Sequence, residues 1–344
     1  MIDGKRHFCL CADALKPRCA QRFHQMSPPA KPWPGSPRPK KINLHSDGQG
    51  GMTNQDLVGC RLAQRSAGDC RMTDATRFQF TNPSVPKAYD EFLVPRLFEP
   101  WANLLLDKIG LRPSEHVLDV ATGPGTVARL AAQRVGIDGR ICAADMAQPM
   151  LQIAKSKPHP ANSAPIEYLQ SPAAPLAAPS GAFDGVLCQQ GLQFFPDRAA
   201  ALREMRRVLK PNGRVGIAVW TEIEDNEIFA AYYAALRATT LAELADLITA
   251  PFSWPSGAAL KAAAEEAGFR NVQLSKPSLP MVLEGGLEQA VSAFAATPVS
   301  PGVAALAQDV QDAFFDRVRR EMNPLLTKGR VIGKMTSNII VGTS

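Results

Sequence analysis

The sequence is poor in the residues that disulfide frameworks, zinc centres and membrane spans require. After residue 71 it contains only two of its 7 cysteines, Cys142 and Cys188, and both stand in apolar runs that predict strands, where a free thiol behaves as a small hydrophobic side chain. No pair of cysteines has the spacing of zinc ligands with histidines nearby. No run of about 18 apolar residues occurs, and the N-terminal apolar run is too short for a secretory signal. We therefore expect no disulfide scaffold, no metal site and no transmembrane segment, and a reduced, cytoplasmic protein.

An excess of charge is also missing from most of the chain, because the net charge of +6 is concentrated at one end. Residues 1–71 contain twelve Lys and Arg against five Asp and Glu, whereas residues 72–344 contain 26 against 27. The second part is therefore near neutral, and its net charge gives no sign of a nucleic-acid partner. We expect none.

The first 71 residues combine their basic charge with six prolines between positions 28 and 39 and the run "SDGQGG" at 46–51. They lack sustained helix or strand periodicity, so we expect residues 1–71 to be a disordered, proline-rich extension. One interpretation is a basic arm for nucleic acid or anionic lipid. The favoured one is an appended or upstream stretch, because Met72 opens "MTDATRFQF", a natural start for the folded part.

The patterns of residues 83–220 predict an α/β fold. Residues 83–115 are expected to form an N-terminal helical cap, which Pro95 and Pro100 break into two or three pieces. Residues 116–220 contain five apolar strand patterns separated by amphipathic helices. This alternation predicts a largely parallel, doubly wound, Rossmann-like sheet that is covered on both faces. Ligands of such sheets bind at the carboxyl ends of the strands.

Residues 221–344 change in character and predict lid insertions and an edge hairpin. Helical patterns fill 222–254 and 286–328, and a further helix is expected to begin at Ser256 and end at Gly268. The run "NVQLSKPSLPMVL" predicts extended chain, and the strand-like "MTSNIIVG" lies near the C-terminus. We expect an antiparallel hairpin at the sheet edge, opened by a helical insertion.

The stretch "VLDVATGPGTVARL" at 117–130 predicts a strand, a glycine turn and a helix, and is the first candidate for a ligand site. It contains a Gly-x-Gly-x-x-Ala pattern that begins at Gly123, and Asp145 follows about 20 residues later, where a ribose-binding acid is expected. Both dinucleotides and S-adenosylmethionine need such a loop. Glycines let the backbone approach the ligand, and a carboxylate accepts the ribose hydroxyls.

Asp119 favours the second of these ligands. It lies within a strand that is expected to be buried on both faces, where a carboxylate is costly without partners. A carboxylate at this position would attract the ammonium and sulfonium groups of S-adenosylmethionine and would repel a pyrophosphate. The alternative is that Asp119 only caps amides of the loop.

Four segments in order resemble class I S-adenosylmethionine-dependent methyltransferases, and most closely the small-molecule branch that includes ubiquinone and menaquinone methyltransferases. They are "VLDVATGPGTVARLA", "GRICAADMAQPMLQIA", "FDGVLCQQGLQFFPD" and "ALREMRRVLKPNGRVGIAVW". The similarity covers residues 83–220 closely and the rest loosely. It implies a seven-stranded Rossmann-like methyltransferase sheet with helical insertions, and S-adenosylmethionine as the cofactor.

The resemblance also implies a set of cofactor-binding residues. The loop against the methionine and ribose portions is formed by Asp119, Ala121, Gly123 and Gly125. Asp145 would take the ribose hydroxyls, Met146 would pack on the adenine, and Gln189 would lie beside the methionine end. Tyr89, in "KAYDEF", is similar to the aromatic residue that covers the cofactor, although a core aromatic on an amphipathic helix is nearly as good an explanation.

One motif departs from the family pattern. The family commonly has Gly-Asp-Ala after the third strand, and its carboxylate accepts the adenine amino group. Ser171, Pro172 and Ala173 stand there in this sequence. We expect the hydrogen bond to be missing or replaced by Ser171, while the amide of Ala173 still reaches the adenine. The loss of one such contact weakens binding by about 1–3 kcal/mol.

The predicted function is methyl transfer by in-line displacement, which positioning alone can accelerate, so no catalytic residue is predicted. The two histidines after residue 71, His116 and His159, are expected to be solvated rather than catalytic. The acceptor is expected to be a quinone, a lipid or an aromatic metabolite, because both insertions are rich in aromatic residues that could roof a pocket, although most of these side chains are expected to serve ordinary helix packing. These are Phe229, Tyr232, Tyr233, Phe252, Trp254, Phe294, Phe314 and Phe315. The alternatives are an NAD(P)-dependent oxidoreductase and a non-catalytic regulatory protein that binds S-adenosylmethionine.

Overall fold

A computed structural model describes residues 87–254 and 256–344. All of these belong to one compact unit. The predicted extension at 1–71 and the proposed start at Met72 lie outside the described residues. None of the described helices has the length and apolar character that crossing a bilayer would require.

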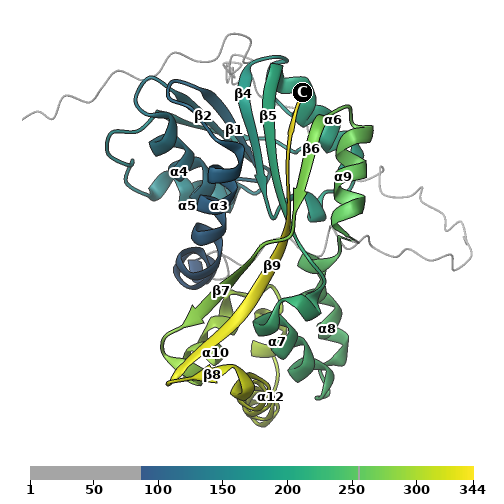
Figure 1. The fold of residues 1–344 in the computed structure, drawn as a ribbon. Helices are drawn as coiled ribbons and strands as arrows, with labels where there is room; N and C mark the ends of the chain where they lie inside the picture. The colour runs from purple at the N-terminus through teal and green to yellow at the C-terminus, as the bar shows by residue number, and fades with distance from the viewer. Residues whose placement is uncertain (1–86, 255) are drawn as a thin grey trace, which may run out of the picture. The chain divides into compact units, whose positions relative to one another are not determined.

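A mostly parallel sheet forms the centre of the described region (Figure 1). Strands β1 to β5 pair in parallel, in the order β3-β2-β1-β4-β5, and β9 and β6 continue the sheet in antiparallel fashion. This confirms the predicted α/β fold and the edge hairpin. The strands are β1 (His116–Val120), β2 (Arg140–Asp145), β3 (Ile166–Gln170), β4 (Phe183–Gln189), β5 (Leu209–Trp220), β6 (Arg270–Ser275), β7 (Ser278–Leu283), β8 (Leu326–Thr327) and β9 (Arg330–Thr343).

The central sheet has the seven predicted strands, in the order β3-β2-β1-β4-β5-β9-β6, and two further strands that pair with β9 bring the total to nine. The two additional strands, β7 and β8, pair with the first half of β9. The change of partner is sharp, since Thr336 pairs with Ser278 of β7 and the next residue, Ser337, pairs with Trp220 of β5. One continuous strand therefore belongs to the central sheet and also to the ribbon beside the helical insertions.

Helices cover both faces of the sheet. Strand side chains alternate in direction, so Leu187 packs in one cluster with α3 and α4, whereas Val186 points to the opposite face, where α6 and α9 lie together. The helices are η1 (Tyr89–Phe98), α3 (Glu99–Ile109), α4 (Thr126–Val135), α5 (Gln148–Ser156), α6 (Arg198–Val208), α7 (Glu227–Arg237), α8 (Ala242–Thr249), α9 (Gly257–Glu266), α10 (Gly286–Ala293), α11 (Ser300–Ala304) and α12 (Gln308–Met322). Short 3₁₀ turns are η2 (Leu192–Phe194), η3 (Ile223–Asp225), η4 (Ala250–Phe252), η5 (Phe294–Ala296) and η6 (Asn323–Leu325).

The N-terminal cap is not broken at its prolines, which corrects the sequence-based expectation. Pro95 lies inside η1, a π-helix, and the element continues for three residues beyond it to Phe98. Pro100 stands in the first turn of α3, where a missing N–H costs little. The backbone stays helical across the junction at Phe98 and Glu99.

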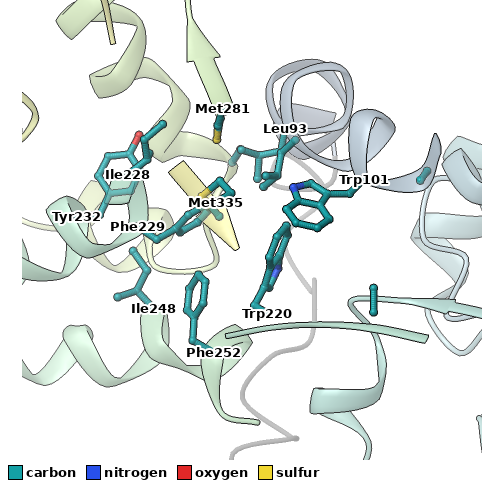
Figure 2. Packing of buried hydrophobic residues seen from close by; sticks show 14 of the residues in the cluster. Leu93, Trp101, Trp220, Ile228, Phe229, Tyr232, Ile248, Phe252, Met281 and Met335 are labelled. Carbon is teal, nitrogen blue, oxygen red and sulfur yellow. The ribbon is translucent and has the colours of Figure 1, made fainter. Parts of the chain in front are cut away.

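The helical insertions pack on their own aromatic residues, which agrees with the expectation that most of these side chains serve helix packing. Phe294 and Phe314 are fully buried with ring centroids 4.9 Å apart, and the hydroxyl of Tyr232 donates to the carbonyl of Ala290 at 2.5 Å. Figure 2 shows Phe229 of α7 and Met335 of β9 in this core. Most of the predicted roof is therefore the hydrophobic core of the insertions. The other predicted members are Phe252 and Trp254, which are buried, and Tyr233 and Phe315, which are half-buried.

Smaller sequence-based predictions are confirmed. The hydroxyl of Ser256 accepts a hydrogen bond from the amide of Ala259 and caps α9, and Gly268 follows the helix with φ +93°. Cys142 and Cys188 are buried free thiols in β2 and β4.

Candidate functional site

The glycine turn joins β1 to α4 at the carboxyl end of the sheet. Ala121, Gly123 and Gly125 all have positive φ, of 58°, 54° and 80°. A Cβ added at Gly123 would meet no atom within 4 Å, whereas one at Gly125 would lie 3.1 Å from the Cβ of Ala154 in α5. Gly125 thus allows close packing of the turn on α5, and Gly123 exposes the backbone to open space that a ligand could occupy.

Asp119 is 1% exposed, and its carboxylate is turned toward the glycine turn. One oxygen, Oδ2, accepts the hydroxyl of Thr122 at 2.5 Å and the backbone N–H of Ala128 at 3.0 Å. Burial raises the pKa of Asp119 to about 7, although these two hydrogen bonds act in the opposite direction. The capping role that the sequence left open is therefore present, and a charged ligand facing Asp119 stays a prediction.

Asp145 ends β2, the strand that pairs with β1. Its Oδ2 accepts the N–H of Gly123 at 2.8 Å, and its Oδ1 accepts the N–H of Ala147 at 2.8 Å. Burial raises its pKa, while these backbone donors lower it. Asp119 and Asp145 are close enough that the charge of Asp145 adds to the raised pKa of Asp119. The structure therefore brings two predicted carboxylates together around one loop.

Tyr89 and Met146 lie at the same end of the sheet. The ring of Tyr89 stacks on Phe98, with centroids 4.7 Å apart. Burial, and then the charge of Asp145, raises the pKa of Tyr89 well above its ordinary value, which places the phenol near that carboxylate. Met146 is 64% exposed, so its side chain is free to cover a flat ligand. The predicted cap residue and adenine contact thus flank the two carboxylates.

Gln189 ends β4 and is tied to the N-terminal cap. Its Nε2 donates to the carbonyl of Phe98 at 2.9 Å, and its buried Oε1 has no hydrogen-bond partner among the described residues. The loop after β3 is self-contained, because the hydroxyl of Ser171 donates to the carbonyl of Pro172 and accepts the N–H of Ala177. A contact of Ser171, or of the amide of Ala173 in the same loop, with the adenine stays a prediction.

Comparison with known families decides the class to which this site belongs. The ubiE/COQ5 methyltransferase family matches residues 80–281, more than half of the chain and all of the strands that surround the glycine turn. The chain belongs to the ubiE/COQ5 methyltransferase family. The resemblance and the fold class predicted from the sequence are thereby confirmed, and the expected methyltransferase class and S-adenosylmethionine cofactor agree with this family.

Curated relatives match different shares of this chain. The ubiquinone/menaquinone biosynthesis C-methyltransferase UbiE of Hahella chejuensis is 34% identical over 134 residues, 38% of this chain and 53% of the relative. The nocamycin O-methyltransferase of Saccharothrix syringae is 34% identical over 120 residues, 35% of this chain and 43% of the relative. The demethylmenaquinone methyltransferase of Staphylococcus aureus strain JH9 is 30% identical over 205 residues, 56% of this chain and 84% of the relative. The chain thus spans about half the length of the first two relatives.

Solved structures show the same fold at low sequence identity. A putative methyltransferase from an antibiotic biosynthesis pathway of Anabaena variabilis has a TM-score of 0.51 at 17% identity, covering 71% of this chain and 97% of that one. A phosphoethanolamine N-methyltransferase 2 of Haemonchus contortus, in complex with S-adenosylhomocysteine, has a TM-score of 0.50 at 16% identity. The match covers 79% of this chain and 59% of that one. These likenesses establish the fold and nothing further.

Sequence reasoning missed one residue of this ubiE/COQ5-family site. Thr126 begins α4, and its buried hydroxyl has no hydrogen-bond partner within the described ranges. The signal was a hydroxyl residue directly after the glycine turn, at a helix N-terminus where polar ligands bind. The histidines stand elsewhere, since His116 begins β1 at the opposite end and His159 is exposed beside Ser163. The described residues contain no group of three or more His, Cys, Asp or Glu that could hold a metal ion.

Proposed function

We propose that this protein transfers a methyl group from S-adenosylmethionine to a small, largely apolar acceptor of the quinone type. The observation on which the proposal depends is the pair of buried carboxylates, Asp119 and Asp145, around an open glycine turn in a member of the ubiE/COQ5 methyltransferase family. Two acids beside Gly123 suit a cationic nucleoside and disfavour a pyrophosphate.

The proposed cofactor site fits the chemistry of this ligand. When bound, S-adenosylmethionine supplies a methyl group whose bond to a positively charged sulfur breaks as the bond to the acceptor forms. Each oxygen of Asp145 accepts a backbone N–H, and the carboxylate has lone pairs left that can accept ribose hydroxyls. The proposed cofactor-binding residues are Asp119, Ala121, Gly123, Gly125, Asp145, Met146, Ala173, Gln189 and Tyr89.

An apolar acceptor is supported by the relatives and by the residues beside the carboxylates. Two of the relatives are named for ubiquinone, menaquinone or demethylmenaquinone. In this chain Phe98 stacks on Tyr89 and meets the ring of Trp220 edge-on at 6.3 Å, and its carbonyl is held by Gln189. This aromatic group offers an apolar surface next to the end of β4.

Two measurements test the proposal. Isothermal titration of the full chain with S-adenosylhomocysteine and, separately, with NADH is expected to give binding of the first only. Incubation with methyl-labelled S-adenosylmethionine and a dithionite-reduced naphthoquinone that bears one prenyl unit is expected to give a labelled product, and mass spectrometry then distinguishes C- from O-methylation. Binding of NADH alone would favour an oxidoreductase, and cofactor binding without transfer to the quinol or to a metabolite extract would favour a non-catalytic regulator.

A further inference from the structure

Two buried polar side chains near the proposed site lack the partners that buried polar groups normally have. Gln193 is 3% exposed, and neither its Oε1 nor its Nε2 has a hydrogen-bond partner among the described residues. Trp254 is 4% exposed, and its indole N–H is likewise unpaired there. Because an unpaired buried donor or acceptor is unfavourable, such groups in a native fold require an explanation.

Both residues lie where the acceptor is expected. Gln193 is in η2, directly after β4, and a Cβ added at the preceding Gly191 would lie only 2.6 Å from the Cβ of Ala121 in the glycine turn. Trp254 follows η4, and η4 contacts η2 and β5. The carboxyl ends of parallel strands are the ligand-binding edge of such a sheet.

Arg198 holds the two segments together from outside. Its Nη2 donates to the carbonyl of Gln193 at 2.6 Å and to the hydroxyl of Ser253 at 3.2 Å, and its guanidinium lies over the ring of Trp254, 5.0 Å from the centroid. The backbone of Gln193 and the indole ring are therefore fixed by one side chain, while the side-chain amide of Gln193 and the indole N–H have no partner in the described part of the chain. Both residues thus contact the same arginine, and each carries a buried polar group that has no partner among the described residues.

We propose that Gln193 and Trp254 form a polar acceptor subsite, which binds an oxygen substituent on the aromatic ring of the methyl acceptor. The inference rests on the proposed function and adds the residues that recognise the acceptor. The pair offers an amide N–H and an indole N–H as donors and one amide oxygen as acceptor. That set complements a hydroxyl or carbonyl oxygen on a ring whose remaining surface is apolar, and it rejects a ring with a methyl group at the same position.

The test uses the full chain, two variants and a matched control. Gln193→Leu removes the amide with similar volume, Trp254→Phe removes the N–H and keeps an aromatic ring for Arg198, and Gln273→Leu makes the same exchange at an exposed position of β6. Each protein is saturated with S-adenosylhomocysteine and titrated with 1-naphthol and with 1-methylnaphthalene, which differ only in hydroxyl against methyl. The KM for the prenylated naphthoquinol and the Tm of the free protein are also measured.

We expect the wild-type protein and Gln273→Leu to bind 1-naphthol at least tenfold more tightly than 1-methylnaphthalene. In both site variants the two affinities should differ by less than threefold. The KM for the quinol should rise at least tenfold in the site variants, while the affinity for S-adenosylhomocysteine stays within twofold. Because the side-chain amide of Gln193 has no hydrogen-bond partner among the described residues, the Tm of Gln193→Leu should not fall. A lowered Tm with unchanged ligand preference would overturn the inference by giving Gln193 a purely structural role.

The outcome separates this inference from the proposed function. A wild-type protein that methylates the quinol but shows no preference for 1-naphthol, or site variants that keep the preference, would reject the subsite and leave the methyltransferase proposal standing. A wild-type protein that neither binds S-adenosylhomocysteine nor methylates the quinol would reject both.

Discussion

Replacement of Asp119 by Asn tests the electrostatic core of the proposed site. The exchange keeps the shape of the side chain and an oxygen that can accept the hydrogen bonds of the Thr122 hydroxyl and the Ala128 N–H, but it removes the negative charge. Asp119 is 1% exposed, so the carboxylate loses almost all of its hydration on folding. The variant should therefore be more stable than the wild-type protein wherever the wild-type carboxyl is ionised.

The size of the effect follows from the pKa of Asp119. Burial raises it from an ordinary 3.8 to about 7. Between these values the folded state keeps a proton that the unfolded chain has released, so the stability of the wild-type protein falls as the pH rises. From pH 5 to pH 8 the free energy of unfolding of the wild-type protein falls by about 3 kcal/mol, because it decreases by about 1.4 kcal/mol for each pH unit up to pH 7. Asp119→Asn lacks this loss, and its Tm relative to wild type should rise by roughly 5–10 °C over the same interval.

The same substitution should weaken binding of the cation. S-adenosylmethionine affinity is expected to fall roughly 10- to 100-fold, as measured by titration at pH 8, because a charge-assisted contact contributes about 1.5–3 kcal/mol. Asp184→Asn in β4 is the control with the opposite sign. There burial is outweighed by hydrogen bonds from Lys210 and the N–H of His116, the pKa is lowered, and removal of the carboxylate should destabilise the protein at neutral pH. Parallel pH dependences for wild type and Asp119→Asn, or unchanged affinity, would refute the reasoning.

Three further substitutions separate binding from stability. Gly123→Ala should lower the free energy of unfolding by roughly 1–2 kcal/mol, because residue 123 has a positive φ. It should also reduce the affinity for S-adenosylhomocysteine, because the new Cβ enters the open space of the turn. An unchanged affinity would place the ligand elsewhere. Ser256→Ala should lower stability by about 1 kcal/mol, seen as a shift in the denaturant midpoint, because the cap on Ala259 is lost. Phe294→Ala should cost about 3–5 kcal/mol in the same assay and leave S-adenosylhomocysteine affinity unchanged at 10 °C, and a loss of affinity there would contradict the separation.

Local patterns were sufficient to predict the central sheet and its helices. The run before Gly123 is apolar because β1 is buried on both faces, and the helix after it has buried residues on one side only. Ser256 and Gly268 marked the ends of α9 by the chemistry of helix caps. Asp119 and Asp145 could be predicted as a pair, because the carboxyl ends of neighbouring parallel strands meet at one edge of the sheet.

The remaining features depend on contacts between distant parts of the chain. The pairing of Ser278 with Thr336 joins residues that an entire helical insertion separates, and no local pattern specifies that register. The helical path through Pro95 likewise depends on the packing of η1, whose buried residues include Leu93 and Leu97. In the sequence Gln193 is an ordinary polar residue, and only the fold reveals that its side-chain amide is buried without a partner among residues 87–254 and 256–344.

Strand β9 explains how an insertion can contribute to the acceptor side of the site. A buried polar network crosses the point where β9 changes partner: the side chain of Asn226, which precedes α7, accepts the N–H of Thr336, and the hydroxyl of Ser337 donates to the carbonyl of Val219 in β5. Ser337 also accepts the side-chain N–H of Gln190, three residues before Gln193. Because these hydrogen bonds are buried and join the insertion to the central sheet, a shift of the insertion would break several of them at once. The insertion is thereby held in register with the end of β4, whereas the glycine turn and both carboxylates are built on β1 and β2 alone. Changes in the insertion should therefore alter acceptor recognition and leave cofactor binding intact.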